Sequence, residues 1–150
     1  LVHDDTIFVI AGEGDLYEEL KKKASDRIIF LGHIPYQRLR DLTLCADMGV
    51  CLLEAKGLSY YYALPNRVFD LISAHVPILA TDFPEIRRVV ENYQSGELIA
   101  EHSPEYLAGV INGMLSKKVD DEKFEKAAQE LCWNKEQKVL EEVIMGLKIK

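Results

Sequence analysis

Three polar residues in the middle of the chain are of types that bind phosphate and ribose. Asn66, Arg67 and Asp70 begin an amphipathic segment that is expected to be a helix over residues 66–74. A helix start offers free N–H groups and a partial positive charge, which suit an anion. An arginine donates charge-assisted hydrogen bonds to a diphosphate, and a carboxylate accepts hydrogen bonds from ribose hydroxyls. The three residues together therefore predict a nucleotide-sugar site.

Each of these side chains also has a purely structural interpretation. Asn66 could cap the helix, Arg67 could be solvated, and Asp70 could pair with Arg67 at a spacing of i,i+3. Taken singly, the structural roles are favoured. Taken together at the edge of a sheet, the three residues favour binding.

Apolar segments that alternate with amphipathic ones place these side chains at such an edge. Residues 6–11 and 27–31 are continuous apolar runs, and strands buried on both faces are expected there. Strands that alternate with helices imply a parallel, doubly wound α/β sheet, whose carboxyl edge binds ligands. The other expected strands are 48–53, 77–80 and 97–100, and the expected helices are 16–24, 36–45, 66–74, 85–91 and 104–116, with two more in 120–147.

Two glycine turns follow the first two expected strands. Gly12-x-Gly14 has the setting of a phosphate-binding turn, but Tyr17 stands where the dinucleotide motif needs a third glycine. A tight turn, with Asp15 as the helix cap, is therefore favoured over a dinucleotide site. Gly32 lets the backbone approach either a neighbouring element or a ligand, and both interpretations stay open.

Aromatic residues and a cysteine add three expectations. Tyr60, Tyr61 and Tyr62 stand in a row in a segment without periodicity, so at least one should be exposed or should line a pocket. Cys51 lies in an apolar strand and is expected to be inert core. Trp133 is expected to anchor the final helices.

Composition narrows the class of protein. The chain has 150 residues, 48% of them hydrophobic and 29% charged, which fits one globular domain. The net charge is −7 and no Lys/Arg cluster is dense, so general nucleic-acid binding is disfavoured. Cys45, Cys51 and Cys132 have neither disulfide density nor metal spacing, which is typical of a cytosolic protein. Because the first residue is Leu1 and not Met, a piece of a longer protein is expected.

The order of these motifs resembles the C-terminal, donor-binding domain of GT-B glycosyltransferases, and more narrowly the retaining enzymes of the glycosyl transferases group 1 family. The resemblance covers nearly the whole chain. It implies a Rossmann-like α/β donor-binding domain over residues 1–150, with extra C-terminal helices, while the N-terminal acceptor domain and the first βα unit are absent. The segments that carry it are FVIAGEG at 8–14, IFLGHIP at 29–35, ALPNRVFD at 63–70, PILAT at 77–81 and LCWN at 131–134.

The resemblance assigns roles to single positions. Asp70 matches the second acid of the family's E-x7-E motif, which holds the donor ribose, whereas Tyr62 occupies the place of the first acid. The segment 63–70 resembles a subgroup with ALPNK-x-FE, whose asparagine and basic residue face the donor phosphates and sugar. The implied donor-binding residues are Gly32, His33, Ile34, Tyr62, Ala63, Leu64, Asn66, Arg67 and Asp70, of which Arg67 and Asp70 are also the implied catalytic residues.

The function implied by the resemblance is transfer of a hexose from a nucleoside-diphosphate sugar to an acceptor, with retention, in polysaccharide or glycoconjugate synthesis. The implied partners are the nucleotide-sugar and the N-terminal acceptor domain of the same protein, with no nucleic acid. No cofactor and no metal are expected. A cytoplasmic location is expected, with contact to the inner face of the membrane through the missing domain. The 150-residue piece alone is expected to be inactive.

Two other classes stay open. A nucleotide-sugar epimerase-like domain shares the fold, and it would need a catalytic carboxylate or histidine set that spans both of its domains. A non-enzymatic nucleotide-binding or receiver module needs paired acids at strand ends. Asp4 and Asp5 precede the first expected strand instead of following it, which disfavours a receiver module.

Overall fold

The expected strands and helices follow one another in the order that the sequence predicts, and a short helix that it does not predict lies at Leu58–Tyr61, after the third strand. The computed structural model describes residues 1–146, so residue 147, the expected end of the last helix, lies outside the described residues. Most expected bounds shift by one to three residues. The elements are β1 (Phe8–Ala11), α1 (Tyr17–Lys23), β2 (Ile28–Gly32), α2 (Tyr36–Leu44), β3 (Gly49–Cys51), α3 (Leu58–Tyr61), α4 (Asn66–Ser73), β4 (Ile78–Thr81), α5 (Pro84–Tyr93), β5 (Gly96–Ile99), α6 (Pro104–Leu115), α7 (Asp121–Glu130) and α8 (Trp133–Gly146).

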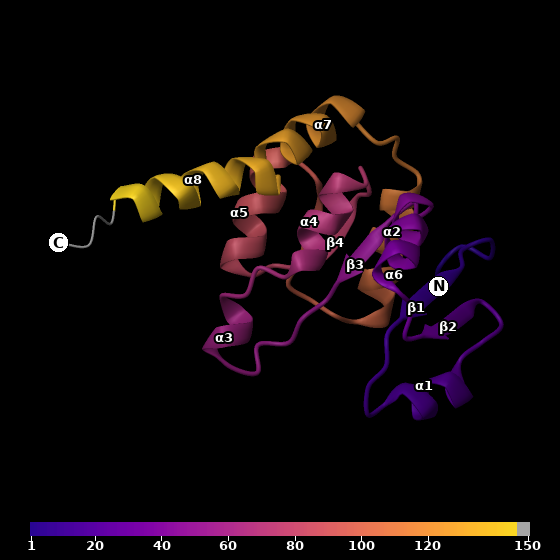
Figure 1. Cartoon of the computed structure of the whole chain (residues 1–150). Coiled ribbons are helices and arrows are strands. Elements are labelled where there is room, and N and C mark those ends of the chain that lie inside the picture. Colours follow the sequence, from indigo (N-terminus) through magenta and orange to yellow (C-terminus); the bar gives the residue numbers. More distant parts are fainter. Residues whose placement is uncertain (147–150) are drawn as a thin grey trace.

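The strands form two sheets, and every pairing is parallel. β1 pairs with β2, while β3, β4 and β5 form a three-stranded sheet with β4 at its centre. In Figure 1, β1 lies between β2 and β3, so the two sheets follow one another across the molecule. The predicted parallel α/β architecture is confirmed, although its strands are divided between two sheets.

The core surrounds β4, all four of whose residues are buried. One cluster of buried residues joins β4 to α4, α5 and α7, and a second joins β4 and β5 to α6. The central strand is therefore covered on both faces, as expected of a doubly wound sheet. The largest fully buried side chains include Ile72, Ile78, Leu79, Ile86 and Ile99.

The first two strands are less buried than the sequence predicts. Phe8, Val9, Ile29 and Leu31 are each about 40% exposed, with 43%, 38%, 41% and 41% of their surface accessible. The physical reason is a lack of cover, because α4, α5, α6 and α7 all pack against the other sheet. On this sheet the seven-residue α1 contributes Tyr17, whose ring meets Phe30 edge-on at 5.4 Å. The expectation that these strands are buried on both faces is therefore wrong.

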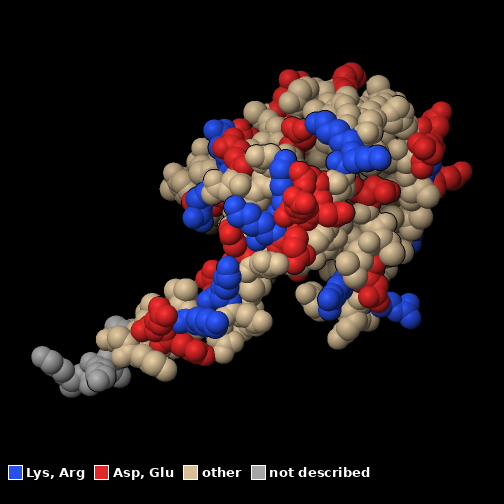
Figure 2. Space-filling view, turned by 90° about the horizontal axis from the view of Figure 1, so that it is seen from above, with Lys and Arg blue, Asp and Glu red and all other residues tan. Residues whose placement is uncertain are grey.

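Two helices form the last part of the described chain, as the sequence predicts, but Trp133 does not anchor them. Trp133 is 66% exposed, because it opens α8, which extends away from the body of the molecule (Figures 1 and 2). Phe124 and Ala127 of α7 are buried instead and fix this end of the chain to the core. Within the described residues, no helix is both long and apolar enough to cross a membrane. The face drawn in Figure 2 mixes acidic and basic side chains.

Candidate functional site

The first turn of α4 carries two of the three predicted side chains. Pro65 precedes the helix with extended backbone angles, and Asn66 is the first helical residue. The asparagine makes no side-chain capping hydrogen bond, so its expected structural role as a cap is wrong. Val68, Leu71 and Ile72 form the buried stripe of the helix at spacings of three and four residues. This stripe fixes α4 against the core and leaves Asn66 exposed.

Arg67 and Asp70 are also exposed, one turn apart on α4. No ion pair between them occurs among the described residues, so the expected i,i+3 pair does not form. The charge of Arg67 acts on the pKa of the Cys51 thiol, which lies at the end of β3. Burial raises the pKa of Cys51, and the positive charge of Arg67 lowers it by a smaller amount. The guanidinium therefore lies near the carboxyl end of β3, where an anion could meet it.

The ends of β3 and β4 are joined by a side chain that sequence reasoning missed. The buried Thr81 hydroxyl accepts a hydrogen bond from Leu53 N–H at 2.9 Å and lies 3.1 Å from the Leu53 carbonyl oxygen. His102, which follows β5, places its Nε2 at 3.3 Å from the same hydroxyl. One signal was available in the sequence, because Thr81 and His102 are polar residues at or just after the ends of neighbouring parallel strands.

Three aromatic rings stand beside this edge. Tyr60, Tyr61 and Tyr62 are 52%, 37% and 57% exposed, which confirms that at least one of them is exposed. Tyr61 meets Tyr62 edge-on at 5.0 Å and packs on Phe83 at 5.2 Å. Phe83 is buried directly after β4, so the tyrosine segment is held against the carboxyl end of the central strand. Cys51 is fully buried, as predicted.

The second group of predicted donor-binding residues lies at the carboxyl end of β2. Gly12 N–H donates to the Gly32 carbonyl at 2.7 Å, and the Glu13 carboxylate accepts from His33 N–H at 3.3 Å. Gly32 has a positive φ of 63°, and a Cβ there would meet the side chains of Glu13 and Tyr17 at 3.5 and 3.6 Å. These are ordinary contact distances, so the positive φ, and not a close approach, is what favours glycine at this position. A turn follows the second glycine, because Tyr17 N–H donates to the Gly14 carbonyl at 3.0 Å, and Asp15 does not cap α1.

The structure thus places the predicted site residues in two groups. Gly32, His33 and Ile34 follow β2, whereas Tyr62, Ala63, Leu64, Asn66, Arg67 and Asp70 lie before and on α4. Within residues 1–146, no hydrogen bond or ion pair joins the two groups. Both groups lie at carboxyl ends of parallel strands, which is where open α/β sheets bind ligands.

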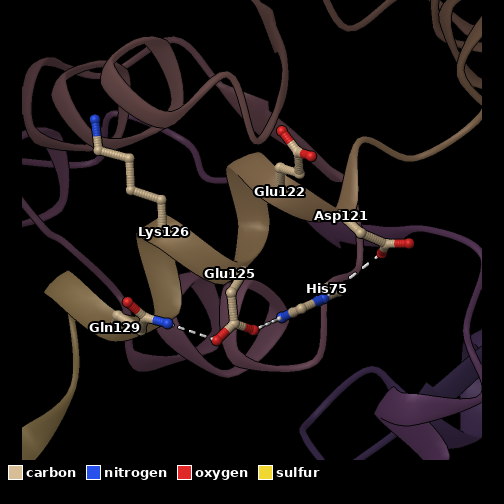
Figure 3. A pocket seen from close by; sticks show the side chains of 6 residues that line it. All are labelled: His75, Asp121, Glu122, Glu125, Lys126 and Gln129. Atoms are coloured by element: carbon tan, nitrogen blue, oxygen red, sulfur yellow. Dashed lines mark hydrogen bonds and ion pairs between the residues drawn. The ribbon is translucent and has the colours of Figure 1, made fainter.

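The hollow drawn in Figure 3 lies at the other edge of the sheet. It is lined by the residues that surround His75, which follows α4 and precedes β4. The two ring nitrogens of His75 lie 3.6 Å from Asp121 and 3.6 Å from Glu125, and its ring stacks on Phe124. None of the predicted site residues lines this hollow. Among the described residues, no three His, Cys, Asp or Glu side chains are grouped to hold a metal ion.

Comparison with known proteins decides which family uses this arrangement. Residues 1–131 match the family described as glycosyl transferases group 1. The chain belongs to this family. A similar curated protein is the chitobiosyldiphosphodolichol beta-mannosyltransferase of Mus musculus, which is 29% identical over 136 residues, covering 83% of this chain and 27% of that protein. The family that the sequence motifs resemble is thereby confirmed.

A solved structure shows the same fold. This chain is similar to the crystal structure of WaaG, a glycosyltransferase involved in lipopolysaccharide biosynthesis, with a TM-score of 0.62 and 18% identity. The similarity covers 83% of this chain and 33% of that one. The predicted Rossmann-like fold of GT-B glycosyltransferases is therefore confirmed. The chain spans about a quarter to a third of the length of these proteins.

Proposed function

We propose that this chain is the donor-binding domain of a retaining glycosyltransferase and that it binds a nucleoside-diphosphate sugar. The observation that carries the proposal is the position of Arg67. It stands on the first turn of α4, exposed, beside the end of β3, and it takes part in no ion pair within residues 1–146. A guanidinium in that position suits the diphosphate of a nucleotide, because it can donate two parallel hydrogen bonds.

The neighbouring groups would bind the remaining parts of the donor. The N–H groups of the first turn of α4 and the Asn66 amide would face phosphate or sugar oxygens. Asp70, exposed one turn further along, would accept hydrogen bonds from the ribose hydroxyls. The backbone of Gly32, His33 and Ile34 would border the base. Family membership supports this assignment, because a glycosyltransferase needs a sugar donor.

In the proposed reaction, these residues would act mainly by electrostatic stabilisation. The bond between the anomeric carbon and the diphosphate oxygen breaks, a new bond to the acceptor oxygen forms, and the proton of the acceptor hydroxyl passes to the leaving diphosphate. Negative charge develops on the leaving diphosphate, and Arg67 with the N–H groups at the start of α4 would stabilise it. Asp70 would hold the donor in register for this step. No metal is part of the proposal.

The acceptor site would lie in an N-terminal domain of the same protein, outside residues 1–150. The relatives named above support this, because this chain covers 27% and 33% of their lengths. The product would be a polysaccharide or glycoconjugate, made in the cytoplasm. Because the acceptor site would lie outside it, the 150-residue piece alone would be inactive.

Nucleotide titration of the full-length protein tests the proposal. UDP, GDP and ADP are titrated by calorimetry against the natural protein and against Arg67→Ala and Asp70→Ala. One nucleoside diphosphate should bind. Arg67→Ala should weaken that binding by about 10- to 100-fold, which is the usual loss for a hydrogen bond to a charged group.

Two matched variants control for loss of charge. Arg88→Ala removes an exposed arginine of α5 that pairs with Glu85 at 2.8 Å, and Asp26→Ala removes an exposed acid before β2. Both should bind the nucleotide as the natural protein does. If no nucleoside diphosphate binds, or if Arg88→Ala weakens binding as much as Arg67→Ala, the assignment is wrong.

A further inference from the structure

A polar cluster lies at the carboxyl ends of β4 and β5. Its members are the buried Thr81 at the end of β4, Leu53, which follows β3, and the exposed His102, which follows β5. The Thr81 hydroxyl lies 2.9 Å from Leu53 N, 3.1 Å from Leu53 O and 3.3 Å from His102 Nε2. The donor site proposed above gives His102 no role.

The hydrogen-bonding capacity of the Thr81 hydroxyl indicates where the protons of this cluster lie. A hydroxyl donates one hydrogen bond and accepts two, a backbone N–H only donates, and a carbonyl only accepts. Leu53 N–H therefore takes one lone pair of the hydroxyl, and the Leu53 carbonyl takes its proton. The remaining lone pair is left for His102 Nε2, and this third contact is a hydrogen bond only if Nε2 carries a proton. One tautomer of His102 thus satisfies all three contacts.

The other ring nitrogen of His102 is free to meet a ligand. In a neutral imidazole, a proton on Nε2 leaves Nδ1 without one, so that Nδ1 can only accept a hydrogen bond. In the described part of the chain, the ring of His102 makes no hydrogen bond besides its contact with Thr81. Because the residue is exposed, a hydroxyl of a bound molecule can reach this acceptor.

The segment that carries His102 is fixed to the central strand. Asp82 N–H, directly after β4, donates to the Ile99 carbonyl at the end of β5 at 2.9 Å. The Ser103 hydroxyl donates to the Glu101 carboxylate, and these two residues flank His102. The imidazole is therefore held both through its ring and through its neighbours in the chain. An acceptor held in this way loses little conformational entropy when a ligand binds.

The order of the donor's parts along the sheet indicates which part would reach His102. In the proposed function, the base lies after β2 and the diphosphate lies at the start of α4, which follows β3. The hexose is attached to the other end of the diphosphate from the nucleoside. The strands follow one another across the molecule in the order β2, β1, β3, β4 and β5 (Figure 1). A donor that continues in this direction carries its hexose from β3 toward the ends of β4 and β5, where Thr81 and His102 lie.

We propose that His102 binds the hexose of the sugar donor and that Thr81 positions it for this role. The inference rests on the proposed function and adds a residue that selects the sugar. Nε2–H donates to the Thr81 hydroxyl, and Nδ1 accepts a hydrogen bond from one hydroxyl of the hexose. A hexose without a hydroxyl at that place leaves Nδ1 without a partner and binds more weakly.

Nitrogen-15 NMR of the full-length protein, labelled at its histidines, tests the tautomer without any ligand. The spectrum is recorded at about pH 8, where a histidine is neutral. The signal of His102 is assigned by its absence from His102→Gln, and it should show a protonated Nε2 and an unprotonated Nδ1. Thr81→Ser keeps the hydroxyl and should keep this pattern, whereas Thr81→Val should give a mixture of the two tautomers. A proton on Nδ1 in the natural protein would overturn the proposal.

Binding of the nucleotide with and without its hexose tests the contact itself. UDP, GDP and ADP are compared with UDP-glucose, UDP-galactose, GDP-mannose and ADP-glucose by calorimetry on the full-length protein. His102→Gln keeps a donor near the place of Nε2 but has no acceptor at the place of Nδ1. This variant should bind the nucleoside diphosphate as the natural protein does. It should bind the tightest of the four nucleotide-sugars about 3- to 10-fold more weakly, which is the usual loss for one neutral hydrogen bond.

A second variant is the matched control for the lost acceptor. His102→Asn places an amide oxygen near the position of Nδ1, so it should bind that nucleotide-sugar more tightly than His102→Gln does. If His102→Gln binds both ligands as the natural protein does, or weakens both equally, His102 does not contact the hexose, and this inference is wrong while the proposed function stands. If no nucleoside diphosphate binds to the natural protein, the proposed function is wrong and this inference with it.

Discussion

The hydroxyl of Thr81 contacts both backbone groups of Leu53 and so ties the end of β4 to the end of β3. It lies 2.9 Å from Leu53 N and 3.1 Å from Leu53 O, and its residue is 5% exposed. A hydroxyl has one proton, which serves either the Leu53 carbonyl or His102 Nε2 at 3.3 Å. A single oxygen atom therefore links the end of β4 to residues that follow β3 and β5.

Thr81→Val removes this oxygen with little change of shape. It leaves Leu53 N–H without a partner, so we expect the free energy of unfolding to fall by about 1–3 kcal/mol. Thr81→Ser keeps the hydroxyl and is the matched control, with a smaller loss expected from the missing methyl group. Urea denaturation of both variants of the full-length protein measures the difference. Equal losses would mean that the hydroxyl contributes nothing beyond packing.

Two glycines should respond in opposite ways to alanine. A Cβ at Gly96 of β5 would come within 1.9 Å of the Ile78 carbonyl oxygen, which is rigid backbone of the central strand. Gly113 of α6 has no atom within 4 Å of the same position. Gly96→Ala should therefore lower the melting temperature, whereas Gly113→Ala should raise the free energy of unfolding by about 0.5–1 kcal/mol. If both variants melt at the same temperature, the close approach of β5 to β4 is not as described.

The buried face of α4 should determine the stability of the whole three-stranded sheet. Ile72 is fully buried in the cluster that joins α4, α5 and α7 to β4. Ile72→Ala removes three carbon atoms and should cost about 2–5 kcal/mol, while Ile72→Val should cost about 0.5–1.5 kcal/mol. Thermal denaturation followed by circular dichroism measures both. A loss below that of the valine variant would show that this face is not packed as described.

Stability should fall at alkaline pH because of one thiol. Burial raises the pKa of Cys51 above that of the unfolded chain, so the folded protein keeps a proton that the unfolded chain loses. The resulting stabilisation is complete below the ordinary cysteine pKa of about 8.5 and is lost as pH rises through the folded value. As pH rises from about 8 to about 9.5, the free energy of unfolding of Cys51→Ala should therefore fall less than that of the natural protein.

An exposed cysteine provides the control for this pH dependence. Cys45 lies at the surface, and Cys45→Ala should leave the alkaline decline of the natural protein unchanged. The measurement is the free energy of unfolding from urea titrations at each pH. A decline in Cys51→Ala that matches the natural protein would assign the effect to other groups.

Features set by local sequence were predictable. The apolar residues of α4 recur at helical spacing, and Pro104 begins α6, so type and position of both helices follow from the chain alone. The grouping of Asn66, Arg67 and Asp70 on α4 was predicted for the same reason. Their roles in donor binding remain predictions.

Features that depend on distant neighbours were not predictable. The apolar residues of β1 indicate a strand, but their burial depends on what covers the sheet. The contact of Thr81 with Leu53 and His102 joins three strand ends that are more than 20 residues apart. Side-chain caps failed too: α1 starts one residue later than expected, so Asp15 is not at its N-cap position, and Asn66 is the first residue inside α4 and not the residue before it.

The helix that carries Arg67 is fixed along its buried side and just past its last turn. Its buried stripe packs on the core, and His75, just past its last turn, lies between two carboxylates of α7. Groups held on such a rigid support lose little conformational entropy when a ligand arrives, so more of each contact appears as affinity. In the proposed donor site, α4 would therefore present Arg67 and Asp70 on a backbone that is already fixed before the donor arrives.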